Sequence, residues 1–322
     1  MSILVKQGGL RTTIQDLGRY SFQKYGVVVG GAMDSFSHKL ANLLVGNQIS
    51  EATLEITLLG PELVFLEDTI FAICGGYFLP QLNFDVVPMG RPIFVKKGSI
   101  LKFGNCQSGC RAYLAIKGGI DTPLVMMSRS TYEPAKYGGL HGEKLKKGDI
   151  IPVKSQKLKN NFIVHNDNFS TTRWFVHSLK KSKKIRVTRG RQYSDFTLEA
   201  IENFFEKEYQ LSLDSDRMGY RLEGEKLVTL NTVEQISEAT AFGTVQVPAD
   251  GQPIILMADR QPTGGYPKLA NVISVDLPLL AQLKPRDMVQ FEEISLEEAQ
   301  ELYVAQEKEL RRLSILLKQI RR

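Results

Sequence analysis

Short apolar runs bounded by turn-forming residues recur along the whole sequence, and they point to a mainly β fold. The runs are "ELVFLEDTIFAIC" (62–74), "RPIFV" (91–95), "SILKF" (99–103), "RAYLAI" (111–116), "KIRVTRG" (184–190), "GTVQV" (243–247), "PIILMAD" (253–259) and "NVISVD" (271–276). They are rich in Val, Ile, Phe and Tyr, and Gly, Pro and Asp end them, as is typical of strands. None approaches the roughly 18 apolar residues of a membrane helix, so we expect no membrane partner.

A turn pattern occurs three times, as "KKGSILKF" (96–103), "LKKGDIIPV" (145–153) and "LKPRDMVQF" (283–291). Basic residues enter the turn, a small or acidic residue follows, and an alternating strand leaves it. The second copy closes the first half of the chain, and the third copy closes the second half. The repeat therefore predicts two β-rich domains of related design, each a barrel or a sandwich.

The basic charge is concentrated in one polar segment. Residues 154–186 hold nine Lys and Arg against one Asp, a net +8 in a chain of net +6, so the rest of the chain is slightly negative, at −2. This composition is typical of a solvated connector and argues against a nucleic-acid-binding face. We therefore expect a β-rich half over 1–153, a connector over 154–184, a second half over 185–294 and a C-terminal amphipathic helix over 295–322.

Helical patterns are few. One covers 35–46, with Ser35 as the expected N-cap and Gly46 as the stop, and a second covers 194–209. The longest begins at Leu296 and has acidic residues early and basic residues late, which suits the helix dipole. Its apolar stripe either docks on its own domain or pairs with another chain, which would make a homo-oligomer.

Several kinds of site are excluded by the motifs. Cys74, Cys106 and Cys110 are too few for a disulfide framework or a four-ligand zinc site, and we expect no metal. The sequence contains no P-loop, no G-x-S-x-G elbow and no H-E-x-x-H. The first residues lack a signal-peptide pattern, so we expect a cytoplasmic protein.

Glycine-flanked polar clusters remain as candidate sites. Their residues are Gln15, Asp16, Arg19, Asp34, Asp216, Arg217, Glu238, Gln246, Gln252, Asp259, Arg260, Gln261, Thr263, Gly264, Gly265 and Tyr266. Each cluster alone fits a turn or a loop clip. Several clusters in one chain favour a shared polar site for a small molecule.

The stretch "ADRQPTGGYP" (258–267) is the strongest of these candidates. We predict that Asp259 and Arg260 are catalytic, together with Asp216 and Arg217 from the "SDRMG" turn, and that the other polar residues bind substrate. In this hypothesis a carboxylate orients a donor or acts as base, and the backbone N–H groups of the glycine pair hold an anion or oxyanion.

Long motifs carry a family resemblance. "TIQDLGR", "GVVVGGAMD", "NLLVGN", "LEITLLGPEL", "SDRMGYRLEG", "GTVQVPADGQPIILMADRQPTGGYP" and "LAQLKPRDMVQF" closely resemble the allophanate hydrolase subunit 2 family. That family is also called biotin-dependent carboxyltransferase-like or KipA-like, and the match runs from Leu4 to Phe291. One departure is Gly190-Arg191-Gln192, where the family usually reads Gly-Pro-Gln; losing the proline frees the backbone and adds a charge.

The resemblance implies cyclophilin-like β-barrel domains and a role as the C subunit of an ATP-dependent 5-oxoprolinase, which opens 5-oxoproline to glutamate. Its implied partners are a KipI-like protein, similar to allophanate hydrolase subunit 1, and a third oxoprolinase subunit, with ATP used at the level of the complex. A biotin-dependent carboxyltransferase acting on a urea or amide nitrogen is one alternative. Because no Met-Lys-Met attachment sequence is present, biotin would arrive on a separate carrier chain. A non-catalytic regulator of a kinase-inhibiting partner is the other alternative.

Overall fold

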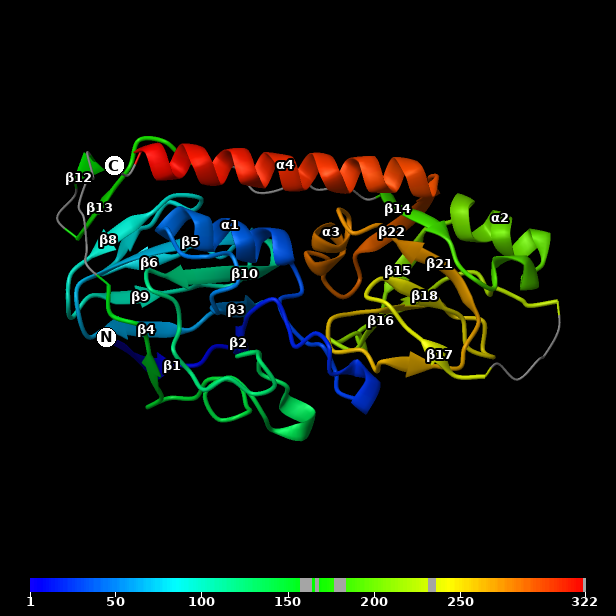
Figure 1. Cartoon of the computed structure of the whole chain (residues 1–322), viewed down its shortest axis with the longest axis horizontal. Coiled ribbons are helices and arrows are strands. Elements are labelled where there is room, and N and C mark those ends of the chain that lie inside the picture. Colours follow the sequence, from blue (N-terminus) through cyan, green and yellow to red (C-terminus); the bar gives the residue numbers. More distant parts are fainter. Residues whose placement is uncertain (157–163, 166–167, 177–183, 231–235, 321–322) are drawn as a thin grey trace. The chain divides into compact units, whose positions relative to one another are not determined.

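The chain divides into two compact units (Figure 1). The computed structural model describes residues 1–156, 164–165, 168–176, 184–230 and 236–320. Unit 1 comprises Met1–Arg19, Gly30–Leu179 and Leu310–Arg322, and unit 2 comprises Tyr20–Val29 and Lys180–Glu309. The boundaries therefore differ from a simple division into halves, because Tyr20–Val29 belongs to unit 2 and the end of the C-terminal helix belongs to unit 1.

Unit 1 is built on two sheets. The first has six strands in the order β11-β1-β4-β9-β6-β7, and the second has seven in the order β12-β13-β8-β5-β10-β3-β2. The strands are β1 Ser2–Gln7, β2 Arg11–Gln15, β3 Thr53–Thr57, β4 Glu62–Phe65, β5 Thr69–Tyr77, β6 Gln81–Leu82, β7 Asp85–Val86, β8 Ile93–Val95, β9 Ile100–Lys102, β10 Ser108–Ile116, β11 Ile150–Pro152, β12 Val164–His165 and β13 Phe169–Thr171. A short 3-10 helix, η2, covers Glu133–Ala135.

The two sheets of unit 1 enclose an apolar core to which both contribute. Phe65 of β4 and Phe71 of β5 stack with their ring centroids 5.3 Å apart. Strand β10 has both faces buried: Leu114 packs in this core, whereas Tyr113 packs in a second cluster on the other face. Burial on both sides explains why β5 and β10 read as continuous apolar runs.

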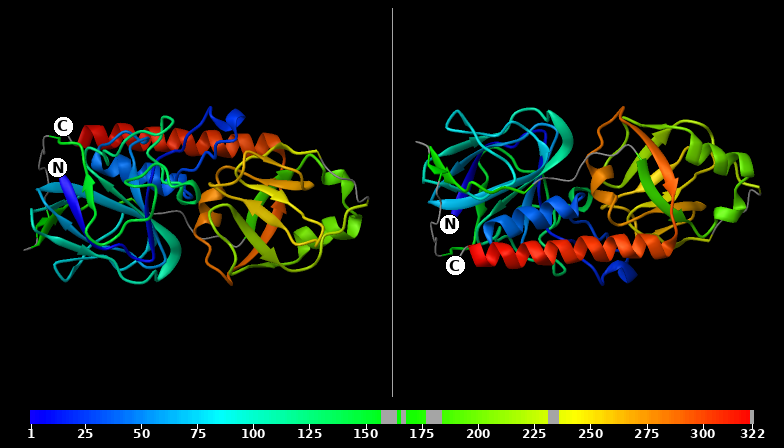
Figure 2. Two further views of the ribbon diagram at one scale, coloured as in Figure 1. Left: turned by 90° about the horizontal axis from the view of Figure 1, so that it is seen from below. Right: turned by 90° about the horizontal axis from the view of Figure 1, so that it is seen from above.

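The second cluster of unit 1 lies under two helices. Helix α1 (Ser35–Val45) contacts β5 and β10, and Leu310 and Leu317 of helix α4 (Leu296–Ile320) join the same cluster. Figure 2 shows the end of α4, in red, beside α1, in blue, from two sides. The C-terminal helix predicted from the sequence is therefore confirmed, and its last turns dock on the chain's own unit 1.

Unit 2 is a closed seven-stranded barrel in the order β14-β21-β18-β19-β16-β15-β22. All neighbours are antiparallel except β14 and β22, a parallel pair. The strands of this unit are β14 Lys184–Arg189, β15 Tyr209–Leu211, β16 Gly219–Glu223, β17 Glu238–Ala239, β18 Thr244–Gln246, β19 Ile254–Leu256, β20 Thr263–Gly264, β21 Lys268–Val272 and β22 Met288–Glu293. Its short helices are η1 Gln23–Tyr25, η3 Tyr193–Asp195, α2 Leu198–Glu206 and α3 Leu277–Ala281. The mainly β class with a barrel and a C-terminal helix is thus confirmed.

The three copies of the turn pattern share one backbone conformation. Gly98, Gly148 and Arg286 occupy the same place in the pattern and have φ of 85°, 93° and 75°. In each copy the next residue donates its N–H to the carbonyl three residues before it, as in Asp287 to Lys284 at 2.9 Å. Unit 1 thus places glycine in this left-handed position twice, whereas unit 2 places an arginine there at a steric cost.

Three element boundaries differ from the sequence predictions. Asp34, not Ser35, is the N-cap of α1, because its carboxylate accepts the N–H of Ser37 at 2.8 Å; Gly46 does end the helix, with φ of 80°. The predicted run 62–74 is two strands, β4 and β5. The predicted helix 194–209 is only α2, because Thr197 caps it and Tyr209 begins β15.

The predicted connector is described only in part. Phe169–Thr171 pairs with β8 as strand β13, and Thr171 is buried. Residues 157–163, 166–167 and 177–183 lie outside the described residues.

Candidate functional site

The outer face of the barrel in unit 2 carries a row of one residue from each of three neighbouring strands, two of them polar. Gln246 of β18 pairs with Ile254 of β19, which pairs with Arg221 of β16. Their neighbours Tyr220 and Ile255 are buried inside the barrel. Because side chains alternate along a strand, Gln246, Ile254 and Arg221 share the opposite, outer face.

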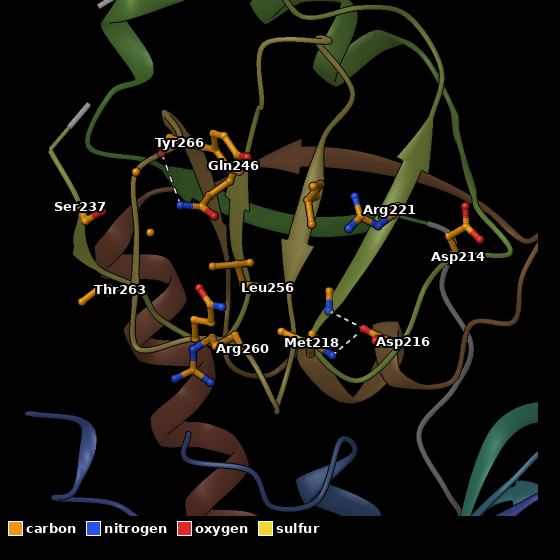
Figure 3. A pocket seen from close by; sticks show the side chains of 15 residues that line it. Asp214, Asp216, Met218, Arg221, Ser237, Gln246, Leu256, Arg260, Thr263 and Tyr266 are labelled. Carbon is orange, nitrogen blue, oxygen red and sulfur yellow. Dashed lines mark hydrogen bonds between the residues drawn. The ribbon is translucent and has the colours of Figure 1, made fainter. Parts of the chain in front are cut away.

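A cleft of about 490 Å³ lies over this row. Eight of the residues predicted from the sequence line it: Asp216, Gln246, Arg260, Gln261, Thr263, Gly264, Gly265 and Tyr266. In Figure 3, Arg221 and Asp214 lie on one side of the cleft, Ser237 and Thr263 on the opposite side, and Gln246 and Leu256 between them. The cleft is therefore polar on its sides and partly apolar at its centre.

Arg217 and Asp259 form a buried ion pair. The carboxylate of Asp259 accepts hydrogen bonds from Nε of Arg217 at 2.8 Å and from Nη2 at 2.9 Å, and both side chains are about 3 % exposed. The N–H of Asp259 also donates to the carbonyl of Arg217 at 2.8 Å. The structure thus joins the "SDRMG" and "ADRQPTGGYP" loops, although neither of these two residues lines the cleft.

Asp216 shapes the rim of the cleft. Its Oδ1 accepts the N–H groups of Met218 at 2.7 Å and Gly219 at 3.1 Å, which closes a tight turn before β16. Asp216 in this turn is held by its own loop, as expected for an Asp beside a glycine.

The glycine pair does not form the anion nest that the sequence suggested. Neither Gly264 nor Gly265 has a positive φ, and Gly264 belongs to strand β20, paired with Glu238 of β17. A Cβ on Gly264 would lie 2.7 Å from Nε2 of Gln246, so glycine permits the close approach of that amide. Nε2 of Gln246 donates to the carbonyl of Tyr266 at 3.4 Å.

Glu238 lies at one edge of the site and pairs with two cations. Its carboxylate is 3.4 Å from Nζ of the buried Lys268 and 3.1 Å from Nη1 of Arg191, which is mostly exposed. Arg191, which replaces the usual proline of the family, therefore helps to hold β17, the strand that pairs with β20. Desolvation raises the pKa of Glu238, but the combined influence of Lys268 and Arg191 is larger, so the pKa lies below its usual value.

Gln252 lies outside the lining of the cleft. Its amide bridges Gly224, accepting that residue's N–H at 3.0 Å and donating to its carbonyl at 3.1 Å. Gln252 therefore ties its own loop to the backbone at Gly224.

The remaining predicted residues belong to unit 1, where each makes internal contacts. Gln15 donates to Thr13 and to the carbonyl of Thr131, and Asp34 caps α1. The buried Arg19 donates to the carbonyl of Ser130 and lies over the ring of Tyr137. The carboxylate of Asp16 accepts hydrogen bonds from Gly18, Ser128, Arg129 and Ser130 at 2.6–2.8 Å.

Arg221 and Asp214 are cleft residues that the sequence reasoning missed. A signal was present for Arg221: "GYRLE" alternates, and with Tyr220 and Leu222 inside a barrel, Arg221 must face outward. For Asp214, no local sequence pattern indicates a position at the cleft; only the tertiary fold brings it there.

Within the described part of the chain, no three His, Cys, Asp or Glu residues cluster closely enough to hold a metal ion. Among the same residues, no helix combines the length and the apolar character that crossing a bilayer requires.

Residues 25–293 match the family described as "Carboxyltransferase domain, subdomain A and B". The chain belongs to this family. Within the carboxyltransferase family it is 36% identical to the 5-oxoprolinase C subunit of Haemophilus influenzae, over 97% of this chain and 95% of that protein. It is 39% identical to the 5-oxoprolinase C subunit of Escherichia coli, over 91% of each protein.

A solved structure shares the architecture of this carboxyltransferase-family chain. It is the urea amidolyase of K. lactis, with 33% identity and a TM-score of 0.88. The match covers 97% of this chain but only 20% of that enzyme, so the chain corresponds to one part of a much longer protein.

Proposed function

We propose that this chain is the C subunit of an ATP-dependent 5-oxoprolinase, which opens 5-oxoproline to glutamate with a KipI-like subunit and a third subunit. The observation that carries the proposal is the extent of the match to the two proteins of that name, which covers 95% and 91% of their length. The match to the urea amidolyase of Saccharomyces cerevisiae covers 17% of that enzyme.

The chemistry of the cleft is consistent with this substrate. 5-Oxoproline is a five-membered lactam that carries one carboxylate. Opening it adds water to the ring carbonyl and breaks the C–N bond, and the ring nitrogen takes up a proton to become an amine. A site for this reaction must hold the carboxylate and polarise the carbonyl. Arg260 and Arg221 offer guanidinium groups, Gln246 offers an amide, and Leu256 offers an apolar surface for the ring methylenes.

The cleft does not fit a nucleotide triphosphate. None of its lining residues belongs to a helix of the described part of the chain, which could offer its N-terminus to phosphate, and two aspartates accompany its two arginines. We therefore assign ATP to another member of the complex and assign the lactam to this one.

Reconstitution tests the proposed function. The purified chain is mixed with its subunit-1-like and third partners, and ATP-dependent release of glutamate from 5-oxoproline is measured. We expect release by the complete mixture, no release without ATP and no release when this chain is omitted. Unchanged release on omission of the chain contradicts the proposal.

Biotin-dependent carboxyl transfer is the second candidate, and the family description and the likeness to urea amidolyase favour it. Carboxyl transfer also needs a site that holds a carboxylate beside an amide-like group. Avidin separates the two candidates, because it sequesters biotin. Glutamate release that persists in avidin supports the oxoprolinase, whereas activity that avidin abolishes supports the carboxyltransferase.

A further inference from the structure

Six of the seven arginines of unit 2 fall into two groups, and the seventh, Arg286, does not line the cleft. Four of them each lie within 3.1 Å of a carboxylate: Arg186 with Asp276, Arg189 with Glu293, Arg191 with Glu238 and Arg217 with Asp259. The two that line the cleft, Arg221 and Arg260, have no carboxylate partner among the described residues. Within the cleft, Arg221 and Arg260 are therefore the two cations available for an external anion.

Arg260 is the more confined of these two cations. Its side chain is half-buried, and its one hydrogen bond among the described residues is a long one, 3.4 Å from Nη1 to the carbonyl of Met257. Its Nε is buried and lacks a hydrogen-bond partner within the same part of the chain. Burial lowers the pKa of Arg260, and the nearby Tyr20 and Asp259 only partly oppose this effect. A partly desolvated guanidinium without an anion is costly, and a bound carboxylate would offset that cost.

The neighbouring acid cannot serve as this anion. Asp259 is adjacent in sequence, but both of its carboxylate oxygens accept hydrogen bonds from Arg217. Arg221 is different, because it is exposed and lies on the same side of the cleft as Asp214, whereas Arg260 lies at another edge (Figure 3). Of the two arginines in the cleft, Arg260 therefore has the positive charge that neighbouring carboxylates neutralise less.

The loop that carries Arg260 is held in place without a ligand. The N–H of Thr240 donates to the carbonyl of Pro262 at 2.9 Å, and its hydroxyl donates to the carbonyl of Gln261 at 2.6 Å. The ring of Phe242 lies 5.8 Å from the guanidinium of Arg260. A loop fixed in this way loses little conformational entropy when a ligand binds.

We propose that Arg260 is the residue that binds the substrate carboxylate, so that the cleft recognises small cyclic amides through their acid group. Arg221 is a secondary contact at most. The inference rests on the proposed function in its choice of ligand, 5-oxoproline, but it concerns binding by this chain alone.

Calorimetric titration of the full-length chain tests the assignment without any of the partner proteins. The ligands are 5-oxoproline and 2-pyrrolidinone, which has the same ring without the carboxylate. We expect Arg260→Gln to weaken 5-oxoproline binding by about 10- to 100-fold, the range for loss of charge-assisted hydrogen bonds. Binding of 2-pyrrolidinone should be unaffected. Arg260→Lys should give an intermediate loss, because it keeps the charge without the planar fork.

Two further variants sharpen this experiment. Arg189→Gln removes an exposed arginine of the same unit outside the cleft and should leave binding unchanged. Arg221→Gln should weaken binding by less than about threefold, as expected for a solvent-exposed charge. Thermal unfolding checks that each variant is folded; if Arg260→Gln is not folded, Arg260→Lys carries the test.

The outcomes separate this inference from the proposed function. Equal 5-oxoproline affinity in the wild type and the folded Arg260 variants overturns the assignment, as does a larger loss in Arg221→Gln. So does the absence of 5-oxoproline binding by the wild-type chain at millimolar concentration. If binding depends on Arg260 but the complete complex releases no glutamate, the carboxylate site stands and the oxoprolinase function fails.

Discussion

Asp16 in unit 1 and Arg260 in unit 2 occupy similar sequence settings and opposite structural ones. Each is a charged residue in a polar cluster, and a glycine follows it within four residues. The carboxylate of Asp16 accepts four hydrogen bonds of 2.6–2.8 Å, whereas the side chain of Arg260 donates a single one, of 3.4 Å, among the described residues. Residues of unit 1 thus satisfy the hydrogen-bonding capacity of Asp16, whereas most N–H groups of the Arg260 side chain remain available to a ligand.

The contrast teaches that residue type and glycine spacing do not distinguish a loop clip from a binding site. What distinguishes them is whether partners from elsewhere in the fold already satisfy the charge. By this criterion Asp259, which the sequence made the foremost catalytic candidate, groups with Asp16, and Arg260 beside it does not.

Removing Asp259 should have the largest effect. Asp259→Ala leaves the buried guanidinium of Arg217 without its carboxylate, and loss of one partner of a buried pair costs about 3–5 kcal/mol. Urea unfolding followed by circular dichroism measures the loss. Glu293→Ala, which removes the partner of the exposed Arg189, should cost less than about 1 kcal/mol. Equal stability of Asp259→Ala and the wild type would return Asp259 to the group of ligand-binding candidates.

The second largest effect should be a loss of stability at acidic pH, which arises from His38 in unit 1. Burial lowers the pKa of His38 from 6.5 to about 4, against the opposing influence of Asp16 and Glu55. Below pH 6.5 the unfolded chain binds a proton at His38 that the folded chain does not. Stability is therefore lost as the pH falls from 6.5 to 4, by about 1.4 kcal/mol per unit.

The variant His38→Gln should lack this contribution, so the difference in free energy of unfolding between it and the wild type should change with pH across that window. Fluorescence of Trp174, the chain's only tryptophan and a residue packed on the second core of unit 1, measures both proteins. A difference that does not vary between pH 4 and pH 7 would show that folding leaves the pKa of His38 unchanged, which contradicts the expected effect of burial.

Asp16→Ala should destabilise unit 1 by about 2–3 kcal/mol, because the N–H and hydroxyl donors around this carboxylate lose their acceptor in a buried loop. The same fluorescence transition measures the change. Binding of 5-oxoproline per folded molecule should remain as in the wild type. A loss of binding without a loss of stability would place Asp16 with Arg260 and break the contrast between the two units.

The repeated turn should give the smallest changes in stability, and they should have opposite signs in the two units. Arg286 has φ of 75°, and Arg286→Gly relieves the steric strain of that conformation. Glycine also increases the entropy of the unfolded chain, but by less than the strain that is relieved. The variant should therefore be more stable than the wild type by about 0.5 kcal/mol. Gly148→Ala, at the matching position of unit 1, should destabilise by about 1 kcal/mol, since its Cβ would meet no atom within 4 Å and only backbone strain acts. Chemical denaturation measures both changes, and the same sign in the two variants would contradict the shared turn geometry.

The amino-acid sequence is sufficient to predict the mainly β class, the C-terminal helix, the glycine that ends α1 and the family. These features depend on short-range patterns: alternation along a strand, the three-and-four spacing of a helix, and the backbone freedom of glycine. The long motifs also located the "ADRQPTGGYP" loop, six of whose ten residues line the cleft.

The partners of the polar residues, in contrast, depend on contacts between distant parts of the chain. Asp259 meets Arg217 across 42 residues of sequence, and Asp16 meets Ser130 across 114. Whether a charge is neutralised depends on such distant pairings, which no local pattern encodes. The closure of one unit into a barrel, through the parallel pair of β14 and β22, is likewise a long-range event. That closure turns Arg221 and Gln246 outward on neighbouring strands, because a strand that is filled on its inner side must present its alternate residues to the other face.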